Sequence, residues 1–451
     1  MTLGLFLVPF GMGLLVWILR KARLLAASFS AAACVVVAIL ALSAPGAAPI
    51  VILGRPFSLS AASAAHLALL ALLMAVAFLY AYAIPQGNLA WSLGLVALGF
   101  WAAALMATSA IVAGLLFLGG AISAVMLVPS PHGETAMIGS RLLVLLVLGG
   151  ILLLMAAQSA ETFAIGGGAG LSPAGGAFIL TLALALLTGL FPFFLWFSQV
   201  AEEGTPLAVI VLGAAMSTTA LLRFGDPSFW VAPLGQVQMT DLLRITGIGT
   251  FVASCVAAAV QRRLGRLLAY SALADWGLIL VGISLRQGAA LDAAMLHLAF
   301  HNVALAAAAL ANGLLRRSFG EDSLSRLCGA VRRAPLALLG VITGGLSLSG
   351  MPAVAGFWGR LGLYRLWAAQ SPGWLVTFVF LSLGSAWGFV RLTIYGMEPA
   401  PLPGSRRERL APALLVLGLS ALLVAVGLVP QVLSLIPGEW LRLLTYRPPA
   451  P

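Results

Sequence analysis

Runs of about 20 apolar residues recur along the whole chain, and this repetition constrains the fold more than any other feature. Each run is long enough to cross the hydrocarbon core of a membrane as a helix. Hydrophobic residues make up 62% of the sequence, more than a water-soluble domain can bury. The 24 Lys and Arg and 13 Asp and Glu lie mostly between the runs. The pattern predicts an all-α polytopic membrane protein, because a charge at mid-bilayer costs about 2.5–3.5 kcal/mol.

We expect about 14 transmembrane helices. Their centres are expected at about residues 10, 35, 73, 98, 118, 148, 184, 213, 252, 275, 300, 345, 383 and 423. The expected domains are an N-terminal unit of three spans over residues 1–85, a first five-helix repeat over 86–225, a second over 240–396, and a C-terminal span and tail over 408–451.

Basic clusters mark one side of the membrane. They are Arg20-Lys21-Arg23, Arg262-Arg263-Arg266, Arg316-Arg317 with Arg332-Arg333, and Arg406-Arg407-Arg409. With 14 spans and an external N-terminus, all of them face the cytoplasm, as the positive-inside rule requires. The sequence therefore predicts a multi-pass protein of the bacterial inner (cytoplasmic) membrane with both termini external. The net charge of +11 is explained by these loops, so no nucleic acid partner is expected.

Two prolines interrupt apolar runs. Pro192 follows Gly189 in the seventh expected span, and Pro352 follows Gly350 in the twelfth. Proline removes a backbone donor, and a break in lipid is tolerated only where protein or water satisfies the freed groups. The breaks lie five spans apart, and an odd offset inverts the second copy. This spacing predicts two inverted five-helix repeats, spans 4–8 and 9–13, with helices 7 and 12 broken. The alternative is two unrelated kinks.

Four stretches, taken in order, resemble one family. They are FPFFLWFSQVAEEGTPLAVIVLGAAMSTTALLR at 191–223, RLLAYSALADWGLILVG at 266–282, HLAFHNVALAAAAL at 297–310, and LSGMPAVAGFWGR at 348–360. The chain resembles a divergent member of the antiporter-like proton-translocating membrane subunits. This family includes complex I subunits N, M and L and the corresponding subunits of membrane-bound hydrogenases and multi-subunit cation/proton antiporters.

The resemblance implies a chain of ionisable groups along the membrane midplane, and most of that chain is missing here. The family's carboxylate in the fifth span would fall near 118–119, where no acidic residue occurs. Three relay lysines of the family correspond to Leu187, Thr218 and Leu305. The basic residue after the second break is retained as Arg360, but an arginine stays protonated and is a poor proton relay. The resemblance therefore implies an incomplete proton path.

Five residues remain as candidates for a reduced path. His297 and His301 share one helix face and can shuttle protons near neutral pH. The open alternatives for this pair are packing with hydrogen bonding, and zinc binding. Asp275 lies inside the tenth expected span, where it needs a partner or a proton. Arg360 is either an electrostatic anchor or a helix-end residue that snorkels. Glu202 is expected to cap the start of the eighth helix together with Glu203, Thr205 and Pro206, and a transport role for it is implied only by the resemblance.

The favoured interpretation is a subunit of a multi-subunit energy-converting complex, linked to NADH-quinone oxidoreductase or hydrogenase chemistry and to electron transport. The chain shows no cofactor, metal or catalytic residue set of its own, so redox chemistry would belong to partner subunits. Expected partners are other membrane subunits, including antiporter-like paralogues, and membrane lipid. One alternative is a subunit of a cation/proton antiporter or of an energised inorganic-carbon uptake transporter. The other is a membrane scaffold without transport.

Overall fold

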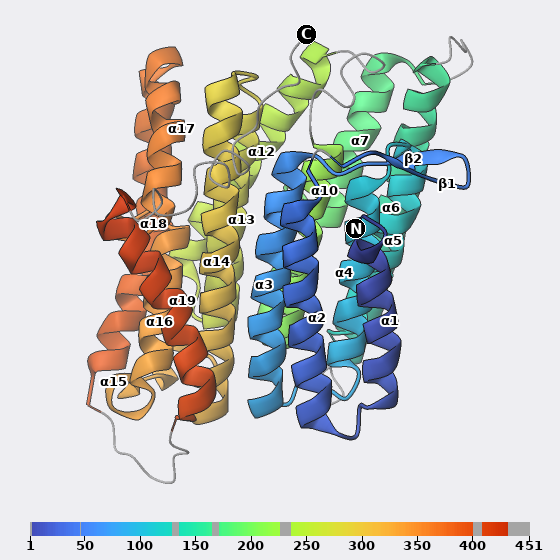
Figure 1. The fold of residues 1–451 in the computed structure, drawn as a ribbon. Helices are drawn as coiled ribbons and strands as arrows, with labels where there is room; N and C mark the ends of the chain where they lie inside the picture. The colour runs from blue at the N-terminus through green and yellow to red at the C-terminus, as the bar shows by residue number, and fades with distance from the viewer. Residues whose placement is uncertain are drawn as a thin grey trace.

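The computed structural model describes residues 2–45, 47–128, 135–164, 171–225, 236–399 and 408–431. These residues form long helices arranged as a bundle (Figure 1). Nine described helices are long and apolar enough to cross a membrane, and five more are apolar but only 10–17 residues long. Every expected span centre falls inside a described helix. The prediction of an all-α polytopic membrane protein is confirmed.

The helices fall into consecutive groups along the chain. The N-terminal group is α1 (Gly4–Ile18), α2 (Arg23–Ser43) and α3 (Ala61–Ala83). Next come α4 (Ala90–Met106), α5 (Ala110–Val125), α6 (Thr135–Ala164), α7 (Pro173–Thr188), α8 (Leu195–Glu203), α9 (Pro206–Ile210), the π-helix η1 (Val211–Met216) and α10 (Ser217–Phe224). The later helices are α12 (Gln236–Val260), α13 (Leu264–Ile283), α14 (Gly288–Phe319), the 3-10 turn η2 (Leu324–Arg326), α15 (Ala330–Arg333), α16 (Pro335–Leu348), α17 (Gly356–Gln370), α18 (Pro372–Met397) and α19 (Leu410–Leu428).

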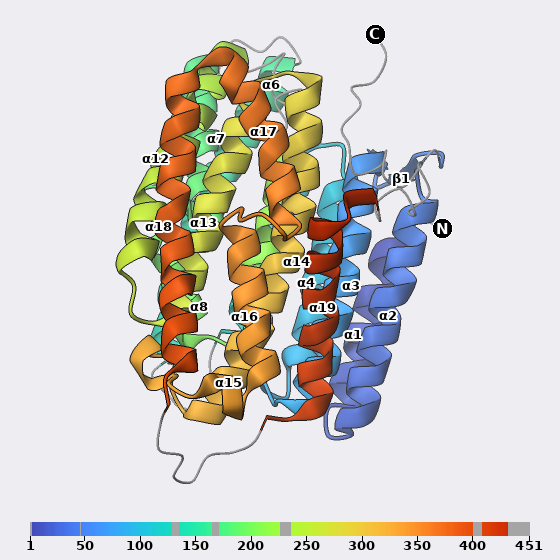
Figure 2. The ribbon, with the colours of Figure 1, turned by 90° about the vertical axis from the view of Figure 1, so that its left-hand side faces the viewer.

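Both proline sites break a helix, as expected. The chain leaves α7 at Gly189 and resumes as α8, and it leaves α16 after Leu348 and resumes as α17. Gly189 and Gly350 both have φ of 70°, in the left-handed region that glycine enters at least cost. Figure 2 shows α7 above α8 but α16 below α17, so the two broken helices run in opposite directions through the bundle. This arrangement is the one that inverted repeats require.

The second half of the chain packs through small residues. A Cβ atom at Gly277 of α13 would lie 2.6 Å from the carbonyl oxygen of Gly247 in α12. Glycines at this crossing therefore let the two backbones approach closely, a common device between membrane helices. Helix α14 lies at the centre, where it contacts α3, α9, α13, α16, α17 and α19 (Figure 2). Side chains on α14 are consequently placed where both halves of the chain meet.

A two-stranded hairpin was not expected. Strands β1 (Ile50–Ile52) and β2 (Arg55–Phe57) pair antiparallel between α2 and α3. Leu53 and Gly54 form the turn, both with positive φ, which suits a two-residue hairpin loop. The hairpin lies against the start of α5, because the Thr108 amide donates to the Pro56 carbonyl oxygen. The two strands could not be distinguished from a membrane helix by composition, since β-branched residues are common in both.

Candidate functional site: a buried carboxylate, two histidines and an arginine

Four of the five candidate residues meet inside the second half of the chain. Asp275 lies on α13, His297 and His301 lie on α14, and Arg360 lies on α17 one turn after the second break. Each is 1% exposed or less. We call these four residues the Asp275 cluster.

Asp275 is the centre of the cluster. Its Oδ1 accepts from His297 Nε2 at 2.7 Å and from Arg360 Nη2 at 2.8 Å and Nε at 3.0 Å. Its Oδ2 accepts from His301 Nδ1 at 2.9 Å. A carboxylate buried this deeply is stable only with a compensating charge and satisfied lone pairs, and the cluster supplies both. The partner that the sequence required for Asp275 is thus supplied by three side chains.

Arg360 is a bridge across the broken helix and does not snorkel. Its Nη1 donates to the carbonyl oxygen of Ser349 and to the hydroxyl of Ser382, each at 3.0 Å, and its Nη2 also contacts the carbonyl oxygen of Leu348. Those carbonyls end α16, so the cation lies at the negative end of that half-helix. The planar fork of five donors makes these contacts together with Asp275, which a single ammonium group does not do.

In each histidine one ring nitrogen is hydrogen-bonded to the Asp275 carboxylate. The other ring nitrogen has no hydrogen-bond partner among the described residues. The nitrogens without partners are His297 Nδ1 and His301 Nε2. With both histidines neutral, the two N–H groups point to the carboxylate and the other two nitrogens are free to accept a proton. The oxygens of Asp275 are occupied by donors, and no group of three His, Cys, Asp or Glu in the described ranges is placed to hold a metal ion. The arrangement fits proton exchange better than zinc binding.

A short polar chain leads away from the cluster. The Ser382 hydroxyl of α18 accepts from Arg360, and it lies 3.2 Å from the hydroxyl of Tyr364. Tyr364 is partly exposed, whereas Arg360 and Ser382 are buried. These two hydroxyls were missed in the sequence, since a lone serine or tyrosine in an apolar run carries no spacing signal.

The three positions at which the resemblance implies relay lysines are fully buried among apolar or uncharged groups. Leu187 packs beside Gly149 of α6. Thr218 accepts from Asn302 Nδ2 at 2.9 Å. Leu305 lines a cavity of about 10 Å³ with Asn312, room for about one water. Among the described residues, no charge lies in place of the missing ones.

Glu202 lies apart from the cluster. It lies in the last turn of α8 and pairs with Arg263 at 3.0 Å and Arg266 at 2.5 Å, although Glu202 itself is only 4% exposed. Thr205 and Pro206 start α9 as expected, since the Thr205 hydroxyl accepts from the Ala208 amide, but the Glu202 carboxylate pairs with the two arginines instead of the helix start. Arg263 and Arg266, which follow α12, explain why Glu202 does not act as a helix cap, since they give its carboxylate two cationic partners.

A second carboxylate, Asp322, joins this ionic group. It accepts from the Gly265 amide at 3.1 Å and lies 4.0 Å from Arg263. Burial raises the pKa of Asp322 above its usual value of 3.8, and the Gly265 amide and Arg316 oppose that shift. Arg316 donates to the carbonyl oxygen of Gly204 after α8. These contacts, which we call the basic-side latch, join α8 to the start of α13 and the end of α14.

His66 is fully buried. Its Nδ1 lies 2.9 Å from the Ala62 carbonyl oxygen and its Nε2 lies 3.1 Å from the Met295 carbonyl oxygen, which joins α3 to α14. The glycine-rich stretch 165–176 is predicted from its composition to be a flexible external loop. Residues 165–170 lie outside the described residues, and α7 already begins at Pro173.

Comparison with known proteins places this geometry in a family. Residues 145–385, which contain the whole Asp275 cluster and both broken helices, match the family described as NADH:quinone oxidoreductase/Mrp antiporter, transmembrane. The chain belongs to this family. The resemblance found in the four sequence stretches is therefore confirmed.

Curated relatives carry the name NADH-quinone oxidoreductase subunit N. The protein from Herpetosiphon aurantiacus is 29% identical over 276 residues, covering 58% of this chain and 54% of that protein. The one from Chromohalobacter salexigens is 29% identical over 299 residues, covering 63% and 60%. The one from Sorangium cellulosum is 30% identical over 298 residues, covering 60% and 57%. The chain thus spans little more than half the length of these relatives.

Solved structures share the fold over the whole chain. A chain of the archaeal membrane-bound sulfane sulfur reductase has a TM-score of 0.81 at 21% identity, covering 99% of this chain and 98% of that one. A chain of respiratory complex I from Thermus thermophilus has the same TM-score, identity and coverage. A chain of the Mrp complex from Dietzia sp. has a TM-score of 0.81 at 18% identity, again covering 99% and 98%.

Proposed function

We propose that this chain is an antiporter-like membrane subunit of a multi-subunit energy-converting complex, quinone- or hydrogenase-linked. Membership of the family and the names of the relatives support this assignment. Partner subunits, antiporter-like paralogues among them, would carry the redox chemistry. The positions of the basic clusters support a bacterial inner membrane protein with both termini external.

The observation that carries the proposal is the Asp275 cluster in the family-matched region. Its two histidines are the groups that can take up a proton, while Arg360 holds the charge of Asp275 fixed. Ser382 and Tyr364 continue the polar contacts of Arg360 toward the surface beside α17 and α18, but they reach the histidines only through this arginine. Uncharged residues at Leu187, Thr218 and Leu305 interrupt the rest of the path. The chain therefore acts mainly as a structural or coupling element with a reduced proton path.

Purification in mild detergent tests the assembly. We expect iron–sulfur or hydrogenase subunits and related membrane subunits to co-purify with the chain. His297→Gln with His301→Gln removes both groups that can take up a proton and leaves the Asp275–Arg360 pair in place, so we expect lower proton translocation per electron in that complex while assembly persists. Unchanged turnover and translocation in the double variant would instead favour a scaffold.

A second candidate is a subunit of a cation/proton antiporter, since the matched family description includes Mrp antiporters. The missing lysines argue against it, because exchange needs an acid–base relay across the membrane. Sodium-dependent proton flux in vesicles that hold this chain and its co-purifying partners, without any electron donor, would favour this candidate over the first.

A further inference from the structure

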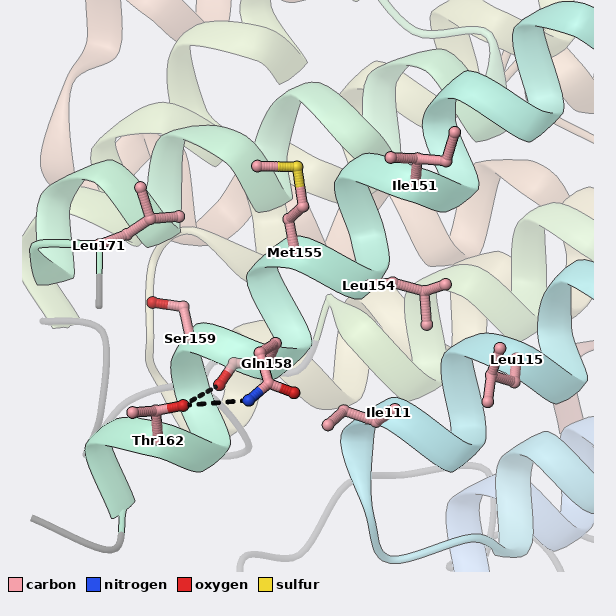
Figure 3. Close-up of a pocket in the computed structure, with 9 residues that line it drawn as sticks. All are labelled: Ile111, Leu115, Ile151, Leu154, Met155, Gln158, Ser159, Thr162 and Leu171. Carbon is pink, nitrogen blue, oxygen red and sulfur yellow. Dashed lines mark hydrogen bonds between the residues drawn. The ribbon is translucent and has the colours of Figure 1, made fainter. Parts of the chain in front are cut away.

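A groove outside the Asp275 cluster lies between α5, α6 and Leu171, just before α7 (Figure 3). Its cavity volume is about 590 Å³. Ile111 and Leu115 of α5 form one wall, and Ile151, Leu154 and Met155 of α6 form the other. Leu115, Ile151 and Met155 are each about half exposed, so their apolar surface faces whatever fills the groove. In a membrane protein that filling material is hydrocarbon.

One end of the groove is polar. Gln158, Ser159 and Thr162 line it, and Gln158 Nε2 donates to Thr162 Oγ1 at 3.3 Å. Ser159 is only 4% exposed, yet its hydroxyl has no hydrogen-bond partner among the described residues. A buried hydroxyl is usually satisfied, so the orphan indicates a partner from outside the chain. The groove therefore fits an amphiphile with a polar group next to Ser159.

The length of the groove matches one leaflet. Ile151 and Thr162 mark its two ends on α6 and are eleven residues apart, which is about 16 Å at 1.5 Å per residue. Half of a hydrocarbon core is about 15 Å. A single acyl chain running from the polar end toward the midplane would fill the groove along its length.

The carboxylate of Glu161 at the polar end of the groove favours one kind of lipid headgroup over another. Glu161 lies there, and its Oε1 accepts from the Ser109 hydroxyl at 2.6 Å and from the Ile111 amide at 3.3 Å. No cation is among the described residues that line the groove. The guanidinium of Arg223 lies close by, on the carbonyl oxygens of Ala107 and Thr108 that precede Ser109. Glu161 is the charged group that contacts the groove wall at Ile111, and a carboxylate attracts an ammonium group.

We propose that this groove binds one zwitterionic phospholipid with a primary amine, of the phosphatidylethanolamine type. One acyl chain lies between α5 and α6, the ester carbonyl accepts from Ser159, and the ammonium group lies near Glu161. The site is independent of the proton path.

Native mass spectrometry of the full chain, in the complex with which it purifies, tests the groove. The protein is loaded from nanodiscs with equal phosphatidylethanolamine and phosphatidylglycerol and then exchanged into detergent. Leu115→Trp fills the groove, and Leu383→Trp is the control because Leu383 on α18 is 51% exposed against 55% for Leu115. We expect Leu115→Trp to lower retained phosphatidylethanolamine by about tenfold, or about 1.4 kcal/mol. Equal retention in the two variants would overturn the site.

The headgroup assignment has its own test. Glu161→Gln keeps an acceptor for Ser109 and the Ile111 amide but removes the charge. We expect wild type to retain phosphatidylethanolamine over phosphatidylglycerol and Glu161→Gln to lose that preference. If wild type retains both lipids equally, the proposed role of Glu161 is wrong. Ser159→Ala is expected to weaken retention of both lipids, and unchanged retention would contradict the ester contact.

Discussion

At the scale of single residues, Arg360 shows how a retained charge can change its role. The family position for a basic relay residue is still basic here, but the guanidinium contacts Asp275, Ser382 and two carbonyl oxygens that end α16. A group held by so many acceptors does not release a proton. Arg360 therefore holds the Asp275 carboxylate in place, and in the proposed path proton uptake is left to His297 and His301.

Removal of Arg360 tests this role. Arg360→Leu leaves Asp275 as an unpaired buried charge, and we expect a loss of about 3–5 kcal/mol in unfolding free energy. Arg360→Lys should lose less, because the charge stays while the fork is lost. Thermal unfolding of the purified protein in nanodiscs provides the measurement. The double variant Asp275→Asn with Arg360→Leu should lose less than the sum of the singles, and strict additivity would show that the two groups do not interact.

Asp322 gives a pH-dependent prediction on the basic side. Burial raises its pKa in the folded protein above the unfolded value of 3.8, so the folded state binds the proton more tightly. The contribution of Asp322 to the free energy of unfolding therefore falls as the pH rises above 3.8. Asp322→Asn keeps an acceptor for the Gly265 amide and removes the charge. We expect the melting temperature of the variant, relative to wild type, to increase between pH 4 and pH 7, and a constant difference would contradict the burial effect.

At the scale of elements, the two helix breaks use the same device. Gly189 and Gly350 both have φ of 70°, and a Cβ atom at Gly350 would overlap the Arg360 side chain. The break and the contacts of Arg360 therefore depend on each other. A side chain at this position would disturb both the turn and the contact with Asp275.

Gly350→Ala is expected to destabilise the protein by more than the usual cost of a left-handed residue, about 1–2 kcal/mol. Gly373→Ala is the control, because a Cβ atom there meets nothing within 4 Å. Thermal unfolding of both variants is compared with wild type. Equal stability of the two variants would show that the break tolerates a side chain.

Helices and breaks were predictable because both leave local marks. Apolar runs separated by charged loops gave the spans, and Pro192 and Pro352 gave the two interruptions. The π-helix Val211–Met216 and the hairpin at Ile50–Phe57 were not predicted. Both depend on backbone hydrogen bonding within apolar sequence, where periodicity carries little information.

At the scale of the whole molecule, each candidate residue could be predicted from the sequence. That the four residues of the Asp275 cluster contact one another could not. His297 and His301 share a face because of their spacing, and Asp275 stood out as an acid inside a span. Sequence order does not give the rotation and depth at which α13, α14 and α17 face one another. That register depends on close glycine contacts between these helices, such as Gly359 of α17 against His297 of α14 and Gly282 of α13 against Leu363 of α17.

New lysines test whether the rest of the path is dry. Leu187→Lys or Thr218→Lys places a charge at a fully buried position, and we expect several kcal/mol of destabilisation and poor assembly. Leu187→Met is the control, since a volume-conserving change costs less than about 1.5 kcal/mol. Yield of the assembled complex and proton flux in vesicles are the measurements. Normal assembly with added proton flux would show that a hydrated path survives.

The opposite charges of Asp275 and Arg360 have an electrical consequence. They cancel, so a voltage across the membrane finds no net charge in the cluster while both histidines are neutral. A proton bound at His297 or His301 would add one unit of charge inside the field. Moving one charge through 100 mV is worth about 2.3 kcal/mol, and the histidines would sense the part set by their depth. Their occupancy would then follow the voltage as well as the concentration of protons.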